Sequence, residues 1–546
     1  MNISSIKLII AQRGRGGKAN RYIFMAWIAF FGHTLSRKGA ARMDQSGKSV
    51  LVLTVLSALA QAVGFFYRVV MARMVGAEVM GLYQLVMSAY AVIQAVTTVG
   101  LTAALSNLTA RYLALNDPLG AHRVRGRCLR LFFLLMLPVG VVTVTCSDAI
   151  SVHLLGDART QLGLILLIPC LTLTGIENLH KNAFYGAARP IPPAVAEVWE
   201  QLVRAAAVLG LLALFLPQYP ERAVGLVMWG MILCEVSSAL TLWTMYRQVY
   251  GVRAARGVRE KLPLRQIAAI ALPVGANALL GNLLGAANSA LAPRQLVRSG
   301  MERSLAISRL GVVCGMTLPM IALPTVYLGA LNLVMMPRLA RATALGQKGV
   351  QRELIAQGME RVCMLTVPCM TAMAVLGEPL GRLLYGREDV GDYVIPLVWA
   401  MGINCCVSVL ATALNSISYQ QTVAFISLAG GGVQVGCTFF LTGLPGVEMG
   451  GYAAGMLLSA VLELVLCLWA VCRHTGLRPR LWRWLRAPGL SAALAGSTAG
   501  LLLRVCQKSG MNGWGCVGLV LAFFAAQYLT AVGLFGKGHK EIDKNA

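Results

Sequence analysis

The chain has 546 residues, of which 57% are hydrophobic and 13% are charged. Apolar stretches of roughly 18 residues or more, the length that crosses a bilayer core, recur along it. This composition excludes a soluble globular protein and indicates a polytopic membrane protein. The formal net charge of +26 lies in segments between the apolar stretches, so membrane topology explains it better than nucleic-acid binding does.

The segment before Met43 does not match the rest of the chain. It contains a basic stretch between Arg13 and Arg21 and a short apolar run over residues 22–31. This run is too short to span a bilayer, and no small-residue cleavage pattern follows it. Met43 begins the sequence MDQSGKS, which leads directly into the first long apolar stretch. We therefore interpret residues 1–42 as an N-terminal extension, either dispensable or the product of a mis-assigned translation start.

From Met43 onward, the apolar stretches predict an all-α membrane protein with fourteen transmembrane helices. The predicted helices lie near residues 49–71, 80–104, 129–151, 160–177, 194–216, 224–246, 266–292, 305–331, 362–377, 393–417, 422–442, 450–472, 487–506 and 514–535.

Lysine and arginine are concentrated in alternate connections between these helices, and such connections face the cytoplasm. The basic connections lie near residues 111–130, 247–265, 338–352 and 473–486. The opposite connections are short and nearly neutral or acidic. This asymmetry predicts a multi-pass protein of the cell membrane with both termini in the cytoplasm.

One connection departs from this pattern. The segment after the seventh predicted helix is expected outside, yet it contains four arginines and a single acidic residue, namely Arg294, Arg298, Arg303, Arg309 and Glu302. Positive charge in such a place indicates either a mis-assigned helix or a functional role, such as facing a water-filled, anion-binding cavity. We favour the cavity.

Similar residues recur at a nearly constant interval along the chain. The interval from Arg68 to Arg294 equals the interval between the Leu-Trp pairs at 242–243 and 468–469. A shared offset of this kind indicates an internal duplication. The expected parts are the extension at residues 1–42, an N-terminal lobe of six helices at 43–247, a C-terminal lobe of six helices at 248–473, and two further helices with a basic cytoplasmic tail at 474–546.

Polar side chains follow one face of several predicted helices. Asn277 and Asn288 lie on the seventh helix, and Asn404 and Asn415 lie on the tenth, each among small residues at helical spacing. Because an amide is costly in lipid, these side chains must point at other helices or at water inside the protein. Two interpretations stay open: helix packing through small residues, or the lining of a cavity.

Three segments resemble the stage V sporulation protein B group of oligosaccharide flippases, in the multidrug/oligosaccharidyl-lipid/polysaccharide (MOP) exporter superfamily. They are residues 63–112 (VGFFYRVVMARMVGAEVMGLYQLVMSAYAVIQAVTTVGLTAALSNLTARY), residues 182–204 (NAFYGAARPIPPAVAEVWEQLVR), which end in an EQxxR motif, and residues 323–342 (LPTVYLGALNLVMMPRLARA). The resemblance covers residues 44 to about 475. It implies two six-helix lobes related by an axis normal to the membrane, with two additional helices.

The resemblance also implies a substrate: a lipid-linked oligosaccharide or peptidoglycan precursor on undecaprenyl pyrophosphate, flipped across the cytoplasmic membrane by alternating access. A pyrophosphate crossing hydrocarbon needs a cationic cavity, and arginine binds phosphate oxygens with a planar fork. Arg68 and Arg294 are the expected pyrophosphate ligands, facing each other across a central cleft, with Arg73 and Arg298 beside them. For Arg68, the alternative is a side chain that extends to the membrane interface.

The sequence also bears on the energy source for transport. The sequence contains no GxxxxGK[ST] motif, so an ion gradient, the membrane potential or the substrate gradient must drive transport. Glu235 and Glu463, in the sixth and twelfth helices, are separated by nearly the same interval as the repeated pairs. Each carboxylate suits a proton or a sodium ion, or else a structural hydrogen bond or an arginine partner. Glu200 and Arg204 are one turn apart, which suits an intrahelical ion pair as well as substrate contact.

Other classes of function fit less well. The fourteen cysteines lie mostly in apolar stretches without CxxC spacing, so no metal site and no cofactor is expected. The expected partners are the lipid-linked glycan and the bilayer, with the chain acting as a monomer and binding no nucleic acid. A cation-coupled multidrug exporter of the MATE type is the alternative, but it would need acidic cavity residues. Enzymatic activity is not expected, because the outer loops are short and no nucleophile and base pair stands out.

N-terminal sequencing of the natively expressed protein tests the interpretation of the segment before Met43. We expect the chain to begin at Met43. A mature protein that begins at Met1 and has an ordered extension would rule this interpretation out.

Overall fold

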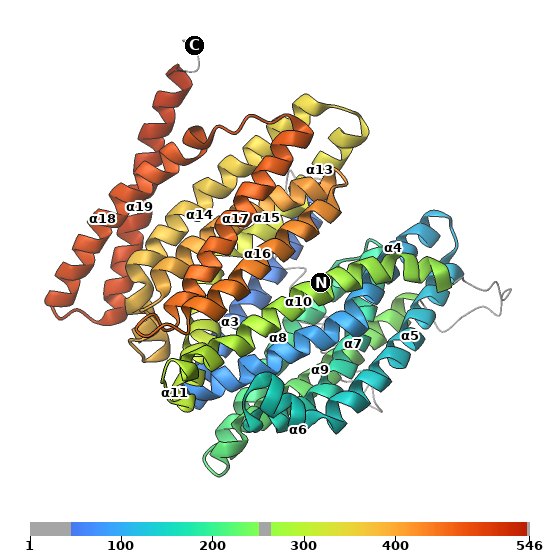
Figure 1. Cartoon of the computed structure of the whole chain (residues 1–546). Helices are drawn as coiled ribbons and strands as arrows, with labels where there is room; N and C mark the ends of the chain where they lie inside the picture. The colour runs from blue at the N-terminus through green and yellow to red at the C-terminus, as the bar shows by residue number, and fades with distance from the viewer. Residues whose placement is uncertain (1–44, 251–263, 543–546) are drawn as a thin grey trace, which may run out of the picture. The chain divides into compact units, whose positions relative to one another are not determined.

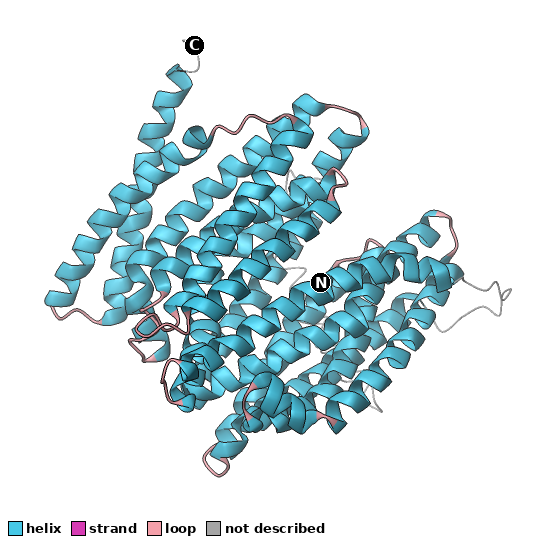
Figure 2. Cartoon of the chain, in the orientation of Figure 1, coloured by secondary structure: helices cyan, strands magenta, loops and turns pink. Residues whose placement is uncertain are grey.

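The computed structural model describes residues 45–250 and 264–542 (Figure 1). The predicted extension at residues 1–42 lies outside this part. Helices account for most of the described residues, and no strand occurs among them (Figure 2). The chain divides into a short unit that ends at Val55 and a compact unit that begins at Leu56. The packing and the sites described below belong to the second unit.

The helices follow one another with short connections. Up to residue 250 they are α3 (Gln45–Gln94), the π-helical η1 (Ala95–Val99), α4 (Gly100–Ala114), α5 (Pro118–Thr145), α6 (Ser147–Ala149), η2 (Ile150–Leu155), η3 (Ala158–Thr160), α7 (Gln161–Gly186), α8 (Ile191–Phe215), η4 (Pro220–Arg222) and α9 (Ala223–Tyr250). From residue 264 they are α10 (Leu264–Arg298), α11 (Arg303–Leu310), η5 (Gly311–Thr317), α12 (Leu318–Ala322), η6 (Leu323–Val326), α13 (Tyr327–Ala344), α14 (Lys348–Tyr385), α15 (Val394–Ser416), α16 (Gln420–Leu441), α17 (Gly450–Thr475), α18 (Leu481–Lys508) and α19 (Gly513–Ile542).

Thirteen helical segments of the described residues are long and apolar enough to cross a membrane. The first, Val52–Ala114, has 63 residues. At 1.5 Å per residue it would be about 95 Å long, roughly three times the thickness of the bilayer core. It bends at Gly76, whose φ of 79° is non-helical and favours glycine. This segment therefore crosses twice, which gives the fourteen crossings that the sequence predicts and confirms the polytopic all-α class.

Two groups of helices pack within the compact unit. In the first group, α4, α5, α7, α8 and α9 contact one another; in the second, α13, α14, α15, α16 and α17 do so. The C-terminal helices α18 and α19 pack together and against α14. Helix α10, the seventh predicted span, packs against α4 and η1 of the first group and also against α16 of the second. Helix α10 therefore contacts both groups.

Apolar side chains fill the interior and also cover the outside of the bundle. Phe132 and Phe184 are completely buried in the first group, and Leu410 is completely buried in the second. On the opposite face of α5, Leu134 and Leu137 are 68% and 72% exposed. Apolar side chains on the outer surface are the arrangement that a lipid solvent favours, because lipid tails do not drive them inward.

Glycines permit a close contact between α3 and the segment formed by α11 and η5. A Cβ atom at Gly311 would overlap the carbonyl oxygen of Ala77, and one at Gly81 would overlap the carbonyl oxygen of Ile307. Because backbone atoms of a packed helix move little, these two positions have no room for a side chain. The contact fixes the second half of α3 against η5.

Substitution of Gly311 by alanine tests this contact. We expect Gly311→Ala to lower the free energy of unfolding by about 1–3 kcal/mol, because it overpacks the helix interface. Gly281→Ala is the matched control, since a Cβ at this helical glycine of α10 meets no atom within 4 Å. Thermal unfolding of the detergent-purified variants gives the readout. Equal melting temperatures for the two variants would contradict the close contact.

Candidate functional site

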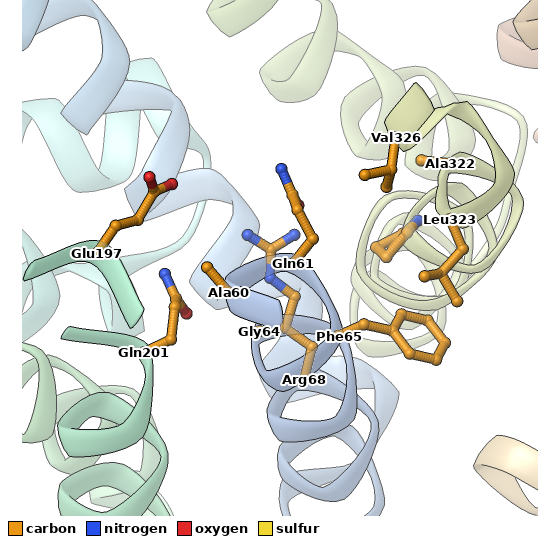
Figure 3. Close-up of a pocket in the computed structure, with 11 residues that line it drawn as sticks. Ala60, Gln61, Gly64, Phe65, Arg68, Glu197, Gln201, Ala322, Leu323 and Val326 are labelled. Atoms are coloured by element: carbon orange, nitrogen blue, oxygen red, sulfur yellow. The ribbon is translucent and has the colours of Figure 1, made fainter. Parts of the chain in front are cut away.

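A cavity of about 300 Å³ lies between α3, α8 and the α12–η6 segment (Figure 3). Its polar lining consists of Gln61 and Arg68 from α3 and of Glu197 and Gln201 from α8. Residues spaced three, four or seven apart share one face of a helix, so each pair points the same way. The rest of the lining is apolar, namely Ala60, Gly64, Phe65, Pro319, Ala322, Leu323 and Val326.

Arg68 differs from the other arginines near the membrane interior. Its side chain is exposed to the cavity, and it has neither a hydrogen-bond nor an ion-pair partner among the described residues. Figure 3 shows Arg68 and Gln61 on α3 beside Glu197 and Gln201 on α8. The lining therefore contains one cation and one anion, whereas the sequence predicts a cavity dominated by arginine.

Arg294 does not face Arg68 across this cavity, in contrast to the expectation from the duplication. It lies one turn before the end of α10, where its guanidinium group donates a hydrogen bond to the carbonyl oxygen of His153 in η2 and lies against Gly156. Arg298 is exposed in the last turn of α10, a favourable place for a cation near the negative end of the helix dipole. Neither residue lines the cavity.

Two further arginines bind backbone carbonyls in the same way. Arg73 of α3 donates to the carbonyls of Leu383 and Leu384 in the last turn of α14, and Arg303 of α11 donates to the carbonyl of Gly156. The last carbonyls of a helix have no partner within the helix, so arginine satisfies them. We term Arg73, Arg294 and Arg303 the arginine latch. It ties α3 to α14, and it ties α10 and α11 to the connection that follows α6.

A carboxylate strengthens this latch. Asp157 lies 4.0 Å from Arg303 and 3.0 Å from Arg159, which in turn lies 2.7 Å from Glu78. Burial alone would raise the pKa of Asp157, but the hydrogen bonds and charge of Arg159, with Arg303 nearby, hold that pKa below its usual value. Because a lowered carboxyl pKa favours the folded state until the pH falls below it, this contact persists at neutral and mildly acidic pH.

Arg309, the last arginine of the atypical connection, also has acidic partners. It lies 3.4 Å from Asp392, 3.6 Å from Glu448 and 4.0 Å from Asp389. Three of the four arginines that the sequence assigns to an anion-binding cavity therefore bind carbonyls or carboxylates of neighbouring connections. The excess of charge in that connection joins helix ends to one another, and this interpretation replaces the cavity lining that we predicted for it.

The predicted asparagines lie at three different kinds of place. Asn288 is buried and accepts a hydrogen bond from Thr438 of α16, which is a contact between helices. Asn277 is exposed on α10, and Asn404 and Asn415 are half-buried on α15. None of them lines the cavity beside Arg68. For Asn288, the structure supports the packing interpretation.

A second polar site is buried between α7, α8 and α9. Lys181 lies 2.7 Å from Glu177 and 2.9 Å from Glu200, and Arg204 lies 2.5 Å from Glu200 and 3.2 Å from Glu235. We term these five residues the buried ion network. It confirms the intrahelical pair between Glu200 and Arg204. It also pairs Glu235 with an arginine, which is one of the roles that the sequence left open for this carboxylate.

Sequence reasoning missed two members of this network. Glu177 and Lys181 are one turn apart within an apolar span, and charged residues inside a span are rare and usually have a structural or functional reason. Two charged residues one turn apart inside an apolar span were therefore the sequence signal for this part of the network. Glu463, the repeat-related counterpart of Glu235, is half-buried and accepts a hydrogen bond from Ser459, with no ion pair to a described cation.

The helix arrangement is that of a known class of membrane transporters. The chain superimposes on a solved structure of the lipid II flippase MurJ in an inward closed conformation with a TM-score of 0.69 and 10% identity, covering 89% of this chain and 99% of that one. An inward-facing multidrug resistance MATE family transporter of the MOP superfamily gives a TM-score of 0.62 at 16% identity, covering 78% and 95%. At these identities the likeness defines the fold.

The sequence comparisons define the family. The model of the polysaccharide biosynthesis protein family matches residues 46–341, more than half of the chain, and the chain belongs to this family. Two relatives come from Bacillus subtilis (strain 168). Stage V sporulation protein B is 23% identical over 425 residues, covering 77% of this chain and 82% of the relative. Sporulation protein YkvU is 20% identical over 440 residues, covering 79% and 96%. The resemblance found in the sequence is confirmed.

Substitution of Arg68 in α3 and of Arg204 in α8 should affect the free energy of unfolding very differently. We expect Arg204→Met to lower the free energy of unfolding by about 3–5 kcal/mol, because it leaves carboxylates of the buried ion network without a partner. Arg68→Met should have little effect, since Arg68 forms no ion pair within the described part of the chain. Thermal and denaturant unfolding in detergent measure both. A similar loss of stability in the two variants would contradict the distinction between a structural and a free arginine.

Proposed function

We propose that this protein flips a lipid-linked glycan, carried on a polyprenyl pyrophosphate, across the cell membrane by alternating access. Its family is that of polysaccharide biosynthesis proteins, and its fold is that of MOP transporters. The observation that carries the proposal is Arg68, whose guanidinium group lies in a cavity among membrane-spanning helices and has no partner among the described residues. An unpaired charge in such a place is costly, so a role in binding an anion accounts for it.

The cavity offers different chemistry to the different parts of such a substrate. The guanidinium group of Arg68 suits the phosphate oxygens, which it binds with two parallel hydrogen bonds. Gln61, Glu197 and Gln201 supply donors and acceptors that suit sugar hydroxyl groups. Phe65 and its apolar neighbours leave the polyprenyl chain a surface compatible with lipid. A mixed lining therefore fits a head group that has both charge and hydroxyl groups.

The arginine latch suits a state of the transport cycle in which one end of the helix bundle is closed. If the other basic connections and both termini face the cytoplasm, alternation of the helices places the segment that contains Arg294 and Arg303 outside. The latch then closes the outer end, and the substrate enters from the cytoplasmic leaflet. Release outside requires the latch contacts to break while the helix groups, predicted as lobes at residues 43–247 and 248–473, rock past each other.

A cation-coupled multidrug exporter is the second candidate. Glu197 is the observation that favours it, because a carboxylate in the cavity suits an organic cation. A dye-efflux assay discriminates the two candidates. Export of cationic dyes that depends on Glu197 would favour the exporter, and transport of lipid-linked sugars that depends on Arg68 favours the flippase.

Reconstitution tests the proposed function. In liposomes that contain a fluorescent polyprenyl-pyrophosphate N-acetylglucosamine, we expect the wild-type protein to move the probe between leaflets. Arg68→Ala should slow this roughly ten- to hundred-fold, since a hydrogen bond to a charged group contributes about 1.5–3 kcal/mol. Arg68→Lys should retain part of the rate. Arg298→Ala is the control, because Arg298 lies outside the cavity. Wild-type rates in Arg68→Ala at equal incorporation would contradict the site.

A further inference from the structure

The buried ion network contains more negative than positive groups. Its three carboxylates, Glu177, Glu200 and Glu235, face two cations, Lys181 and Arg204. All five residues lie within helices that are long and apolar enough to cross the membrane. If every group were ionised, the network would have one uncompensated negative charge. Such a charge in hydrocarbon is very costly, so the network needs one additional monovalent cation.

One oxygen atom marks the place for that cation. Glu200 uses one carboxylate oxygen for Lys181 and the other for Arg204. Glu235 uses Oε1 for Arg204, whereas its Oε2 is buried and has no hydrogen-bond donor among the described residues. The whole Glu235 residue is only 2% exposed. A buried carboxylate oxygen without a donor is rare in folded proteins, because it loses its hydration without compensation.

Among the described residues, no cation other than Arg204 forms an ion pair with Glu235. Ser238 of α9 donates its hydroxyl hydrogen to Glu177 and not to Glu235. The other titratable groups near Glu235 are phenols and thiols, which are neutral at their ordinary pKa values: Tyr90 of α3, Cys170 of α7 and Cys234 of α9. The buried Oε2 of Glu235 therefore has neither a hydrogen-bond donor nor a second cation beside it among the described residues.

We propose that the buried ion network is a proton-binding site, in which the free carboxylate oxygen of Glu235 binds one proton that is taken up and released during transport. The proton comes from water, adds to a carboxylate oxygen and leaves again, so no other bond changes. The role in transport rests on the proposed function, but proton binding itself does not. This site assigns the ion-coupling role to Glu235 and not to its repeat-related counterpart, Glu463.

A proton fits this site better than a metal cation does. The potential ligand atoms of Glu200, Cys234 and Glu235 lie within 4.8 Å of one another. However, both oxygens of Glu200 are already bound by cations, and thiol sulfur is a soft ligand that hard cations avoid. A sodium ion would need several oxygen ligands, whereas a proton needs only the free oxygen of Glu235.

Helix α8 links this site to the cavity. Glu197 and Gln201 line the cavity, and Glu200 and Arg204 follow each of them by three residues on the same helix. A head group that binds beside Arg68 and displaces α8 would therefore shift the ion pairs that Arg204 makes. This arrangement gives a physical route by which substrate binding and proton binding influence each other.

Infrared spectroscopy of the purified protein tests proton binding without any substrate. At neutral pH we expect a protonated carboxyl band that shifts in deuterated water and that is lost in Glu235→Gln. Glu177→Gln should lose it as well, since either substitution leaves two carboxylates for two cations. Glu463→Gln should keep the band of the network. A wild-type spectrum without this band, or a band that persists in both Glu177→Gln and Glu235→Gln, would overturn the proposal.

Transport under a pH gradient tests the coupling. With the fluorescent polyprenyl-pyrophosphate N-acetylglucosamine as the probe, a gradient should change the wild-type flipping rate. In Glu235→Gln the rate should be independent of the gradient, and in Glu463→Gln it should stay dependent. A gradient effect that survives in Glu235→Gln, or stimulation of the wild type by sodium instead of protons, would overturn the coupling role. Failure of the wild type to move the probe, with the infrared band intact, would instead reject the proposed function alone.

Discussion

The cost of placing a charge in hydrocarbon determines the position of the charged side chains in this protein. Lys181 and Arg204 lie between membrane helices and are bound by carboxylates. The arginine latch lies at helix ends, where unpaired backbone carbonyls accept its hydrogen bonds. Arg68 follows neither rule, because it is exposed in a cavity and has no partner among the described residues. This exception gives the cavity its proposed function.

In the proposed transport cycle, three polar regions have different roles. We propose that the latch closes one end of the bundle, that the cavity beside Arg68 receives the head group, and that the buried ion network stores a proton. Helix α8 contributes to the cavity and to the network, and α10 packs against both groups of helices and also contributes Arg294 to the latch. Movement of α10 relative to the first group would therefore change the contact between Arg294 and His153, which is the kind of coupling that the proposed alternating access requires.

The fold could be predicted largely from the sequence, because the length of each apolar stretch and the need to satisfy backbone groups in lipid leave few alternatives. The pairing of Arg68 with Arg294 could not. The duplication inferred from the sequence relates helices but not the depth of a residue within them: Arg68 lies well before the bend at Gly76, whereas Arg294 lies one turn from the end of α10. The buried ion network was also hidden, since its members come from three helices, α7, α8 and α9, whose packing no sequence interval records.

A structure of the protein with polyprenyl-pyrophosphate N-acetylglucosamine bound, determined by cryo-electron microscopy, tests the central claim most directly. The account predicts that the pyrophosphate lies within hydrogen-bonding distance of the Arg68 guanidinium group, with the sugar against Glu197 and Gln201. A head group bound elsewhere, or an Arg68 side chain that points to bulk solvent with the cavity closed by apolar side chains, would contradict it.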